Sequence, residues 1–559
     1  MTLRWKRAAI WALLGLVPLA VLLFFALQRR STLLGMTLRD WAIGQVTEGS
    51  DSVYQLSVGR VQLSLLGGRI VIDSMRLATD TSRNDFRAEP LPVISATASG
   101  CRVLGINTWQ LLVARGVNAR LFRCDAIDAV VLETVRDTVS AQPAAAKAPS
   151  GMPLGQDSIR LPALLPVIVV HRTELPRLSL DYTRRARGGA TTHFTLQRLN
   201  IQLRETRIDP AVRRAARRAL FSEQALVTAD LLTLGGEKQA VVLGRLRGNL
   251  TDSTLALDAV VLGPPASDAD WVKAQKQRSD LIRFHLDSAR LTGVDYRRLG
   301  SAEGAVVVRH ARLHGFGLDV LSDKRLAAGP ARKRLTPQQW VASLDRPLAV
   351  DTIIVAGGKI AYSEHGVGRA GVGTMTWERI QARLTEVRTV GRAGSATPPM
   401  RIEASALLQG QGKLDVSIEI PLTAAQFDMK YSGSLGPIDM MAFNRYAEHV
   451  MPVRVTSGAM QSVRFSIVVR KGRSTGRVVP VYRDFKVALE DKKGGFLKKA
   501  GLSVVSFFAN SFKIRGDNPG KPGEVPMVGR VNRPYAPTAS LPQVYWAALK
   551  EGLGKVLIK

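Results

Sequence analysis

The segment HGVGRAGVG, His365 to Gly373, carries a glycine pattern that is typical of phosphate binding. Gly366, Gly368 and Gly371 have the spacing G-x-G-x-x-G and follow an apolar run. In a dinucleotide-binding fold such glycines lead from a strand into a helix, whose N-terminal N–H groups contact the pyrophosphate. Here they lead into GTMTWERIQARLTEVR, which is strand-like. We therefore interpret the segment as a hairpin loop between two strands.

Other patterns that could support chemistry are weaker. The sequence contains no G-x-S-x-G elbow, no Walker loop and no H-E-x-x-H. His310 and His314 lie in a run rich in β-branched residues, and on a strand they would share a face about 13 Å apart, too far for one metal ion. The sequence therefore assigns no catalytic, cofactor-binding or metal-binding residue, and it identifies no lipid-binding residue. It predicts a protein that is not an enzyme.

Composition narrows the class of partner. The chain has 559 residues, 46% of them hydrophobic and 22% charged, and a formal net charge of +32. Such a charge favours anionic partners, namely nucleic acid, lipid headgroups or polyanionic glycans. No nucleic-acid-binding module is recognisable, so we expect no nucleic acid partner. The two cysteines, Cys101 and Cys124, leave one optional disulfide and exclude a disulfide scaffold or a four-thiolate zinc site.

The N-terminus contains a candidate membrane span. The uncharged run from Ala8 to Leu27 has about the length that a helix needs to cross a hydrocarbon core. Arg29 and Arg30 follow it, and no convincing cleavage site is present. We predict an uncleaved single-pass signal anchor, with the remaining chain on one side of the membrane. Basic residues flank both ends, so the charges alone do not fix the orientation.

Apolar residues alternate with a period of two along most of the chain from residue 53 onward, which indicates strands. The stretch 54–65 shows this pattern, and Gly67 and Gly68 then mark a hairpin turn. Helical patterns are fewer. Helices are expected at 32–46, as a continuation of the anchor, and at 209–226, and amphipathic helices are expected at 494–514 and 541–559.

These patterns predict a division of the chain into modules. We expect a signal anchor, three β modules, two linkers and an amphipathic helical tail. The expected segments are anchor 1–31, first β module 32–136, linker 137–158, second β module 159–326, linker 327–345, C-terminal β module 346–493 and tail 494–559.

An internal repeat supports the β interpretation. The segment 175–207 aligns with 355–388, and in each copy an apolar strand ends at a tyrosine before a glycine-containing loop. The second strands then share five residues: Thr195, Arg198, Leu203, Glu205 and Arg207 match Thr376, Arg379, Leu384, Glu386 and Arg388. Repeated hairpins are typical of an extended sheet that stacks one unit on the next. The predicted fold is mainly β, an elongated, curled antiparallel sheet.

Several of these segments resemble the AsmA-like family of bacterial envelope proteins. They are GRVQLSLLGGRIVIDSMRL after the anchor, VDTIIVAGGKIAYSE from Val350 to Glu364, and SGAMQSVRFSIVV followed by VPVYRDFKVALED. The resemblance implies a protein anchored in the inner membrane through Ala8 to Leu27, with its bulk in the periplasm and a role in outer-membrane biogenesis. It also implies a curled sheet whose apolar concave side carries phospholipid acyl chains.

The leading expectation is therefore non-enzymatic phospholipid transport along an apolar β-groove. The alternative is a membrane-tethered scaffold that binds an outer-membrane or other envelope-assembly protein and fills its sheet with its own side chains. An apolar face open to solvent favours the first hypothesis, and a closed sandwich core favours the second. Neither hypothesis requires a cofactor.

Overall fold

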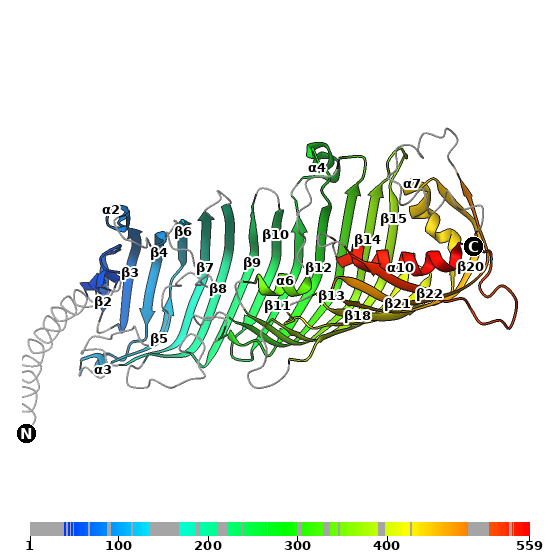
Figure 1. Cartoon of the computed structure of the whole chain (residues 1–559). Helices are drawn as coiled ribbons and strands as arrows, with labels where there is room; N and C mark the ends of the chain where they lie inside the picture. Colours follow the sequence, from blue (N-terminus) through cyan, green and yellow to red (C-terminus); the bar gives the residue numbers. More distant parts are fainter. Residues whose placement is uncertain are drawn as a thin grey trace, which may run out of the picture. The chain divides into compact units, whose positions relative to one another are not determined.

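The computed structural model describes about seven tenths of the chain, as a series of segments separated by gaps. The described segments are residues 39–40, 43–44, 46–48, 50–64, 67–85, 91–112, 116–134, 167–185, 191–208, 222–236, 239–264, 266–296, 298, 305–327, 336–344, 347–389, 397–424, 427–489, 514–535, 539 and 541–558. The described residues are mainly β, with 22 strands and a few short helices (Figure 1). They fall into two compact units. Unit 1 covers the described residues up to 253 except 239–242, and unit 2 covers 239–242 and the residues from 254 onward.

Unit 1 is built from a ladder of strands. The strands β1 and β2 both pair with β3, β3 pairs with β4, and β4 pairs with both β5 and β6. Next come β7, β8 and β9. The elements are β1 (Tyr54–Val58), β2 (Val61–Ser64), β3 (Arg69–Thr79), α2 (Thr81–Asp85), β4 (Val93–Leu104), α3 (Thr108–Leu112), β5 (Val117–Arg123), β6 (Ala126–Thr134), β7 (Ile168–Arg185), β8 (Thr191–Ile208), β9 (Gln224–Gly236) and β10 (Gln239–Asn249), of which the first residues of β10 belong to unit 2.

Unit 2 continues the same building plan within itself. Its strands pair in sequence order from β11 to β18, then with β20, β21 and β22. The strands are β11 (Thr254–Gly263), β12 (Leu281–Thr292), β13 (Val306–Asp323), β14 (Leu348–His365), β15 (Gly373–Arg388), β16 (Met400–Leu408), β17 (Gly412–Ile420), β18 (Met429–Leu435), β19 (Ile438–Asp439), β20 (Val453–Arg470), β21 (Arg473–Leu489) and β22 (Gly529–Pro534). The helices are α4 (Asp268–Ala274), α6 (Pro337–Ala342), the 3-10 helix η2 (Met440–Phe443), α7 (Asn444–Val450) and α10 (Leu541–Leu557).

The pairing corrects one part of the predicted fold. The sheet is mixed and not wholly antiparallel, because β5 and β6 pair in parallel with β7, and β13 pairs in parallel with β14. Parallel neighbours need a long return connection, whereas antiparallel neighbours need only a hairpin. The return before β14 includes α6, which Thr336 caps by accepting a hydrogen bond from the N–H of Gln339.

The repeated hairpins are confirmed as β7–β8 and β14–β15. In both hairpins the register shifts at two neighbouring points, between Leu175 and Leu180 and between Ala356 and Ile360. Both hairpins also follow a parallel pairing, to β5 and β6 in one case and to β13 in the other. The repeat therefore includes the two strands and also the parallel pairing of the first strand with the strands before it.

The helix predictions have mixed outcomes. The helix expected at 541–559 is confirmed as α10. The helix expected at 209–226 is wrong for 224–226, which lie in β9, and its remainder lies outside the described residues except 222–223. Of the 494–514 segment only Ile514 is described, and it forms a bridge to Ile558. The tail 494–559 also contains the strand β22, although only helices were expected there.

The predicted membrane anchor, Ala8 to Leu27, lies outside the described residues. Of the helix expected at 32–46, residues 39–40, 43–44 and 46 are described and are helical. None of the helices in the described part of the chain combines the length and the apolar composition of a membrane span.

Candidate functional site

Nine strands of unit 2 each contribute one apolar side chain to a continuous transverse row. Residues that pair laterally in a sheet point to the same side of it. From β11 to β20 every lateral partner in this row is apolar, and we call it row A. Row A consists of Leu255, Leu291, Ala311, Ile353, Leu384, Ile402, Ile418, Tyr431 and Ile467.

Row A is only half-buried along most of its length. Its members on β11, β12 and β14 to β17 are half-buried, and Ala311 on β13 is 7% exposed. At the far end Tyr431 and Ile467 are 3% and 1% exposed. In a closed sandwich the inward side chains of both sheets interdigitate and become fully buried. Leu255, Leu291 and Ile353 pack around the buried Ala311 and keep part of their surface exposed. The partial exposure of row A therefore indicates an apolar face that is less closed from β11 to β17 than beyond.

A second row, row B, crosses β11 to β15 closer to the other end of the strands. Row B consists of the half-buried residues Leu262, Phe284, Leu318, Ile360 and Trp377. Each lies an odd number of residues from the row A member of its strand, so a regular strand would place the two rows on opposite faces.

A line of irregular residues between the rows removes this conflict. Ala259, Gly315, Gly357 and Arg379 have positive φ angles of 54°, 65°, 73° and 52°, each on a different strand at the same level. A residue with positive φ interrupts the extended backbone and its alternation of faces. The strands keep the same register on both sides of this line, so the interruption crosses them together. On β12, which has no positive-φ residue at this level, Leu286 and Ala289 are both buried although they lie three positions apart, which indicates the same change of face. Rows A and B therefore share one face.

Unit 1 carries a comparable apolar row, row C. All of its members are half-buried, and lateral pairing connects them from β1 to β9. Row C consists of Leu56, Leu77, Ala96, Ala129, Leu180, Leu196 and Leu232. Each unit therefore has an amphipathic sheet with one half-buried apolar face.

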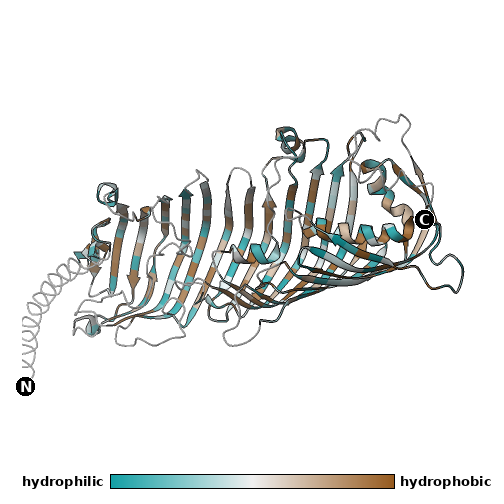
Figure 2. Cartoon of the chain, in the orientation of Figure 1, coloured by the Kyte–Doolittle hydropathy of each residue, from teal (hydrophilic) through white to brown (hydrophobic). Residues whose placement is uncertain are grey.

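Most of the residues beside these rows, which point to the opposite face, are polar. In unit 2 the row next to row A contains seven exposed polar residues, and the half-buried Ala256 and Ile354 interrupt it on β11 and β14. The seven are Arg290, Arg312, Arg383, Glu403, Ser417, Ser432 and Ser466. In unit 1 the exposed residues Ser57, Arg76, Thr97 and Asp128 pair laterally in the same way. Figure 2 shows the resulting alternation of hydrophobic and hydrophilic residues along the strands.

The helix α10 covers the end of the apolar face of unit 2. Tyr545 packs edge-on against Tyr431, with ring centroids 4.7 Å apart. Val544, Ala548 and Val556 are buried in the same core cluster. A Cβ atom at Gly529 would collide with the carbonyl oxygen of Gly552, so the helix backbone lies directly on β22. An apolar ligand chain can therefore contact the face only over the strands that α10 does not cover.

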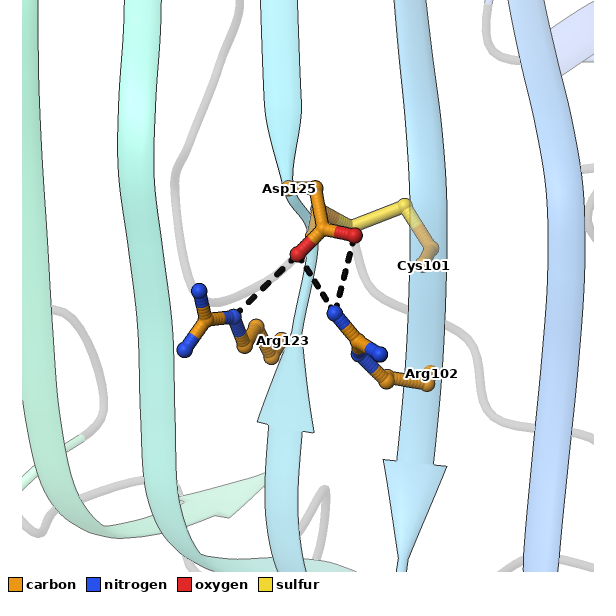
Figure 3. The surroundings of a disulfide bond; sticks show 5 residues. Cys101, Arg102, Arg123 and Asp125 are labelled. Carbon is orange, nitrogen blue, oxygen red and sulfur yellow. Dashed lines mark hydrogen bonds and ion pairs between the residues drawn. A yellow bond between two sulfur atoms is a disulfide. The ribbon is translucent and has the colours of Figure 1, made fainter.

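A disulfide joins Cys101 of β4 to Cys124, and this settles a pairing that the sequence left open. Both cysteines are buried, and Cys124 lies at the break between β5 and β6 (Figure 3). The side chain of Arg102 donates to both carboxylate oxygens of Asp125, at 2.6 and 2.8 Å, and Arg123 donates to the same carboxylate at 3.2 Å. The disulfide thus closes the gap that the strand break leaves opposite β4.

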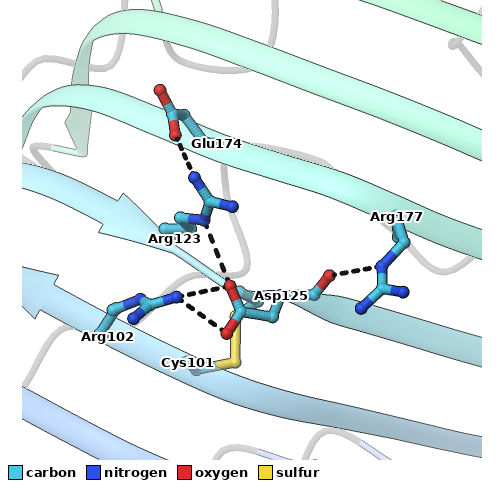
Figure 4. A network of polar contacts seen from close by, with 7 residues as sticks. Cys101, Arg102, Arg123, Asp125, Glu174 and Arg177 are labelled. Carbon is cyan, nitrogen blue, oxygen red and sulfur yellow. Dashed lines mark hydrogen bonds and ion pairs between the residues drawn. A yellow bond between two sulfur atoms is a disulfide. The ribbon is translucent and has the colours of Figure 1, made fainter.

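The charged network around Asp125 has a structural role. Arg123 also donates to Glu174, and Arg177 donates to the backbone carbonyl of Asp125 (Figure 4). Hydrogen bonds from Arg102 and then Arg123 hold the pKa of Asp125 below its ordinary value. Arg102 and Arg123 pair laterally, so the carboxylate offsets the repulsion between two adjacent cations.

The glycine-rich segment connects β14 to β15, as the sequence predicts, and no helix begins at Gly371. Instead the loop supports α7. A Cβ atom at Gly366 would lie 2.5 Å from the carbonyl oxygen of His449, and one at Gly373 would lie 2.5 Å from that of Tyr446. The glycines therefore permit close contact with a helix backbone, which explains why the segment is rich in this residue.

One buried carboxylate lies beside this loop. Glu364 is 8% exposed and accepts hydrogen bonds from the hydroxyl groups of Tyr362, at 2.6 Å, and Tyr446, at 3.3 Å. Burial raises the pKa of both phenols, and the neighbouring Glu364 raises it further. Both hydroxyls therefore remain protonated donors at neutral pH, and they fix α7 to β14.

The residues singled out from the sequence are not brought together. His310 and His314 lie on β13, as expected for a strand, and the glycine loop lies beyond the end of the neighbouring strand. Within the described segments no group of three or more His, Cys, Asp or Glu side chains could hold a metal ion. The half-buried rows were not identified from the sequence, because they depend on the register between strands. The best candidate site is therefore the apolar face itself.

Comparisons with known proteins add no identification. No protein-family model matches the chain, and no curated protein shows significant similarity to it.

Proposed function

We propose that this protein is a non-enzymatic lipid carrier that holds phospholipid acyl chains on its half-buried apolar face. In this proposal it is anchored in the inner membrane through Ala8 to Leu27, its bulk lies in the periplasm, and it serves outer-membrane biogenesis as an AsmA-like protein. The observation that carries the proposal is row A, which is continuous and, except for the buried Ala311, half-buried from β11 to β17. A face of this kind loses unfavourable contact with water when an apolar chain covers it.

The arrangement also supports a position for the cargo in unit 2. Acyl chains would lie over β11 to β17, because α10 already occupies the face at β18 and β20. Rows A and B would contact them on either side of the line of positive-φ residues. The polar face, with Arg312 and Arg383, would remain in water.

Site-specific photocrosslinking of the full chain tests this function. A benzophenone amino acid is placed at Leu384, in row A, or at the adjacent exposed position Arg383 on the opposite face. In unit 1 the same comparison uses Ala129 of row C and the exposed Asp128. The protein is irradiated in membranes that contain its native lipids, and adducts are identified by mass spectrometry. Phospholipid adducts are expected at Leu384 and Ala129 and at neither control position.

Two outcomes would refute the carrier hypothesis. Equal phospholipid adducts at both faces would mean that the protein contacts lipid without holding it on the apolar face. Protein adducts at Leu384 and Ala129, without lipid, would favour the membrane-tethered scaffold, whose apolar face binds an envelope-assembly partner.

A further inference from the structure

A loop at the C-terminal end of unit 2, residues 518–528, is fastened at its base. The side chain of Asn518 is fully buried and donates to the carbonyl oxygens of Pro480 and Met527. Its Oδ1 atom accepts the N–H of Met527 at 2.8 Å. In Figure 1 this loop, which leads into β22, projects away from the strands. Loops closed in this way by their own contacts are frequently functional.

The outer part of the loop presents apolar side chains to water. Val525 is 87% exposed, Met527 is 42% exposed and Val528 is 47% exposed. Within the loop, Glu524 accepts the N–H of Lys521 through its side chain, and the N–H of Glu524 donates back to the carbonyl of Lys521. The exposure of the apolar residues is therefore imposed by an ordered backbone, and a contiguous apolar surface of this kind indicates a contact site.

Three arginines lie on the adjoining polar face. Arg477 of β21 pairs laterally with Arg530 of β22 on one side and with Ser466 of β20 on the other. Arg464 lies two residues before Ser466 on β20, so its side chain points to the same face. All three side chains are on one face, and all three residues are exposed. Among the described residues none of the three has an ion-pair or hydrogen-bond partner for its side chain. Like charges placed side by side repel each other, so this cluster favours an anion.

We propose that this end of unit 2 docks onto the surface of an anionic phospholipid bilayer. Val525, Met527 and Val528 enter the headgroup region, and Arg464, Arg477 and Arg530 contact lipid phosphates. Apolar side chains on a loop that leads directly into the arginine-bearing strand β22 match the two layers of such a surface, whereas acidic groups alone would leave the apolar residues unmatched. This contact is separate from the predicted N-terminal anchor and does not depend on cargo binding.

Vesicle capture by the full chain tests the proposal. The protein is placed in nanodiscs of phosphatidylcholine, and fluorescent vesicles containing phosphatidylglycerol are added at increasing concentration. Capture is expected for anionic vesicles and not for pure phosphatidylcholine vesicles. Each arginine near an anionic surface contributes about fivefold in affinity, so R477Q/R530Q should weaken capture by about 25-fold. The matched control is R290Q/R312Q, another laterally paired, exposed arginine pair of unit 2 that lies on β12 and β13.

A second readout follows the loop itself. An environment-sensitive fluorophore is attached through Val525→Cys or, as control, through Val261→Cys, which is 51% exposed on β11. The native cysteines form a disulfide and do not compete for the label. A blue shift at position 525 alone is expected on adding anionic vesicles. The proposal is overturned if wild-type protein does not capture these vesicles, if both double variants weaken capture equally, or if position 525 stays in water.

Discussion

Arg198 and Arg379 have the same left-handed backbone conformation, each with a φ angle of 52°, at matched positions of the two repeated hairpins. Glu205 and Glu386, also matched, have φ angles of 51° and 57°. Residues other than glycine rarely adopt this conformation. Its recurrence at aligned positions shows that the repeat preserves the bulges of the strands as well as their composition.

The first expectation concerns the bulge at Arg379. A β-branched residue is poorly tolerated at positive φ but well tolerated at a regular strand position. Arg379→Ile should therefore lower the free energy of unfolding of unit 2 by about 1–2 kcal/mol. Arg383→Ile, an exposed change on the same strand, should have little effect. Urea unfolding checks the comparison, and Arg379→Gly should retain most of the stability. Equal losses for the two isoleucine variants would contradict this account.

The second expectation concerns the disulfide between Cys101 and Cys124, which are 23 positions apart in the sequence. Closing a loop of this size restricts the unfolded chain and stabilises the folded state by about 3 kcal/mol. The double variant C101S/C124S should therefore unfold at a lower temperature than the wild type. Dithiothreitol should lower the melting temperature of the wild type and leave that of the variant unchanged. A wild type insensitive to complete reduction would contradict the expected contribution.

The third expectation concerns the contact of α10 with the sheet. Gly552 is buried, and a Cβ atom there would collide with the side chain of Val478. Gly552→Val should destabilise the C-terminal core by about 1–3 kcal/mol and uncover Tyr431. Binding of a hydrophobic dye and the melting temperature report these effects. Trp546→Val, at a position 57% exposed on the same helix, serves as the control and should change neither measurement substantially.

The fourth expectation concerns acid sensitivity at Asp323, whose side chain is 4% exposed. Arg325 donates to both carboxylate oxygens, at 2.9 and 2.7 Å, and this holds the pKa of Asp323 below its ordinary value of 3.8. A lowered folded-state pKa stabilises the fold above the unfolded value and loses this contribution as the pH falls through the folded value. Asp323→Asn should therefore lower the melting temperature at pH 6, and the deficit should shrink below pH 3.8. Asp319→Asn, an exposed change on the same strand, is the control for the substitution itself.

The sequence was sufficient for features that depend on local pattern. Period-two alternation predicted the strands, the aligned segments predicted the hairpins β7–β8 and β14–β15, and the turn at 365–373 followed from them. Amphipathic periodicity predicted α10. The pattern at 209–226 was misleading, because 224–226 form ladder bonds with β8 that local propensity does not describe.

Features that depend on the register between strands could not be predicted from the sequence. The parallel pairing of β13 with β14 is set by the path of the chain between them, and no residue pattern marks it. The disulfide forms because Cys124 interrupts the ladder opposite Cys101, which only the pairing of β4 with both β5 and β6 reveals. Row A is likewise a property of nine strands in register, and none of its members is unusual alone.

The line of positive-φ residues through Ala259, Gly315, Gly357 and Arg379 limits how this protein can change in length. A single inserted or deleted residue in one strand would rotate every side chain beyond it to the other face and break its alignment with both neighbours. A whole hairpin with its positive-φ residues in place would keep the pattern. Such a sheet can grow in width by duplicating hairpins, but the positions at which its strands change face are fixed for all of them together.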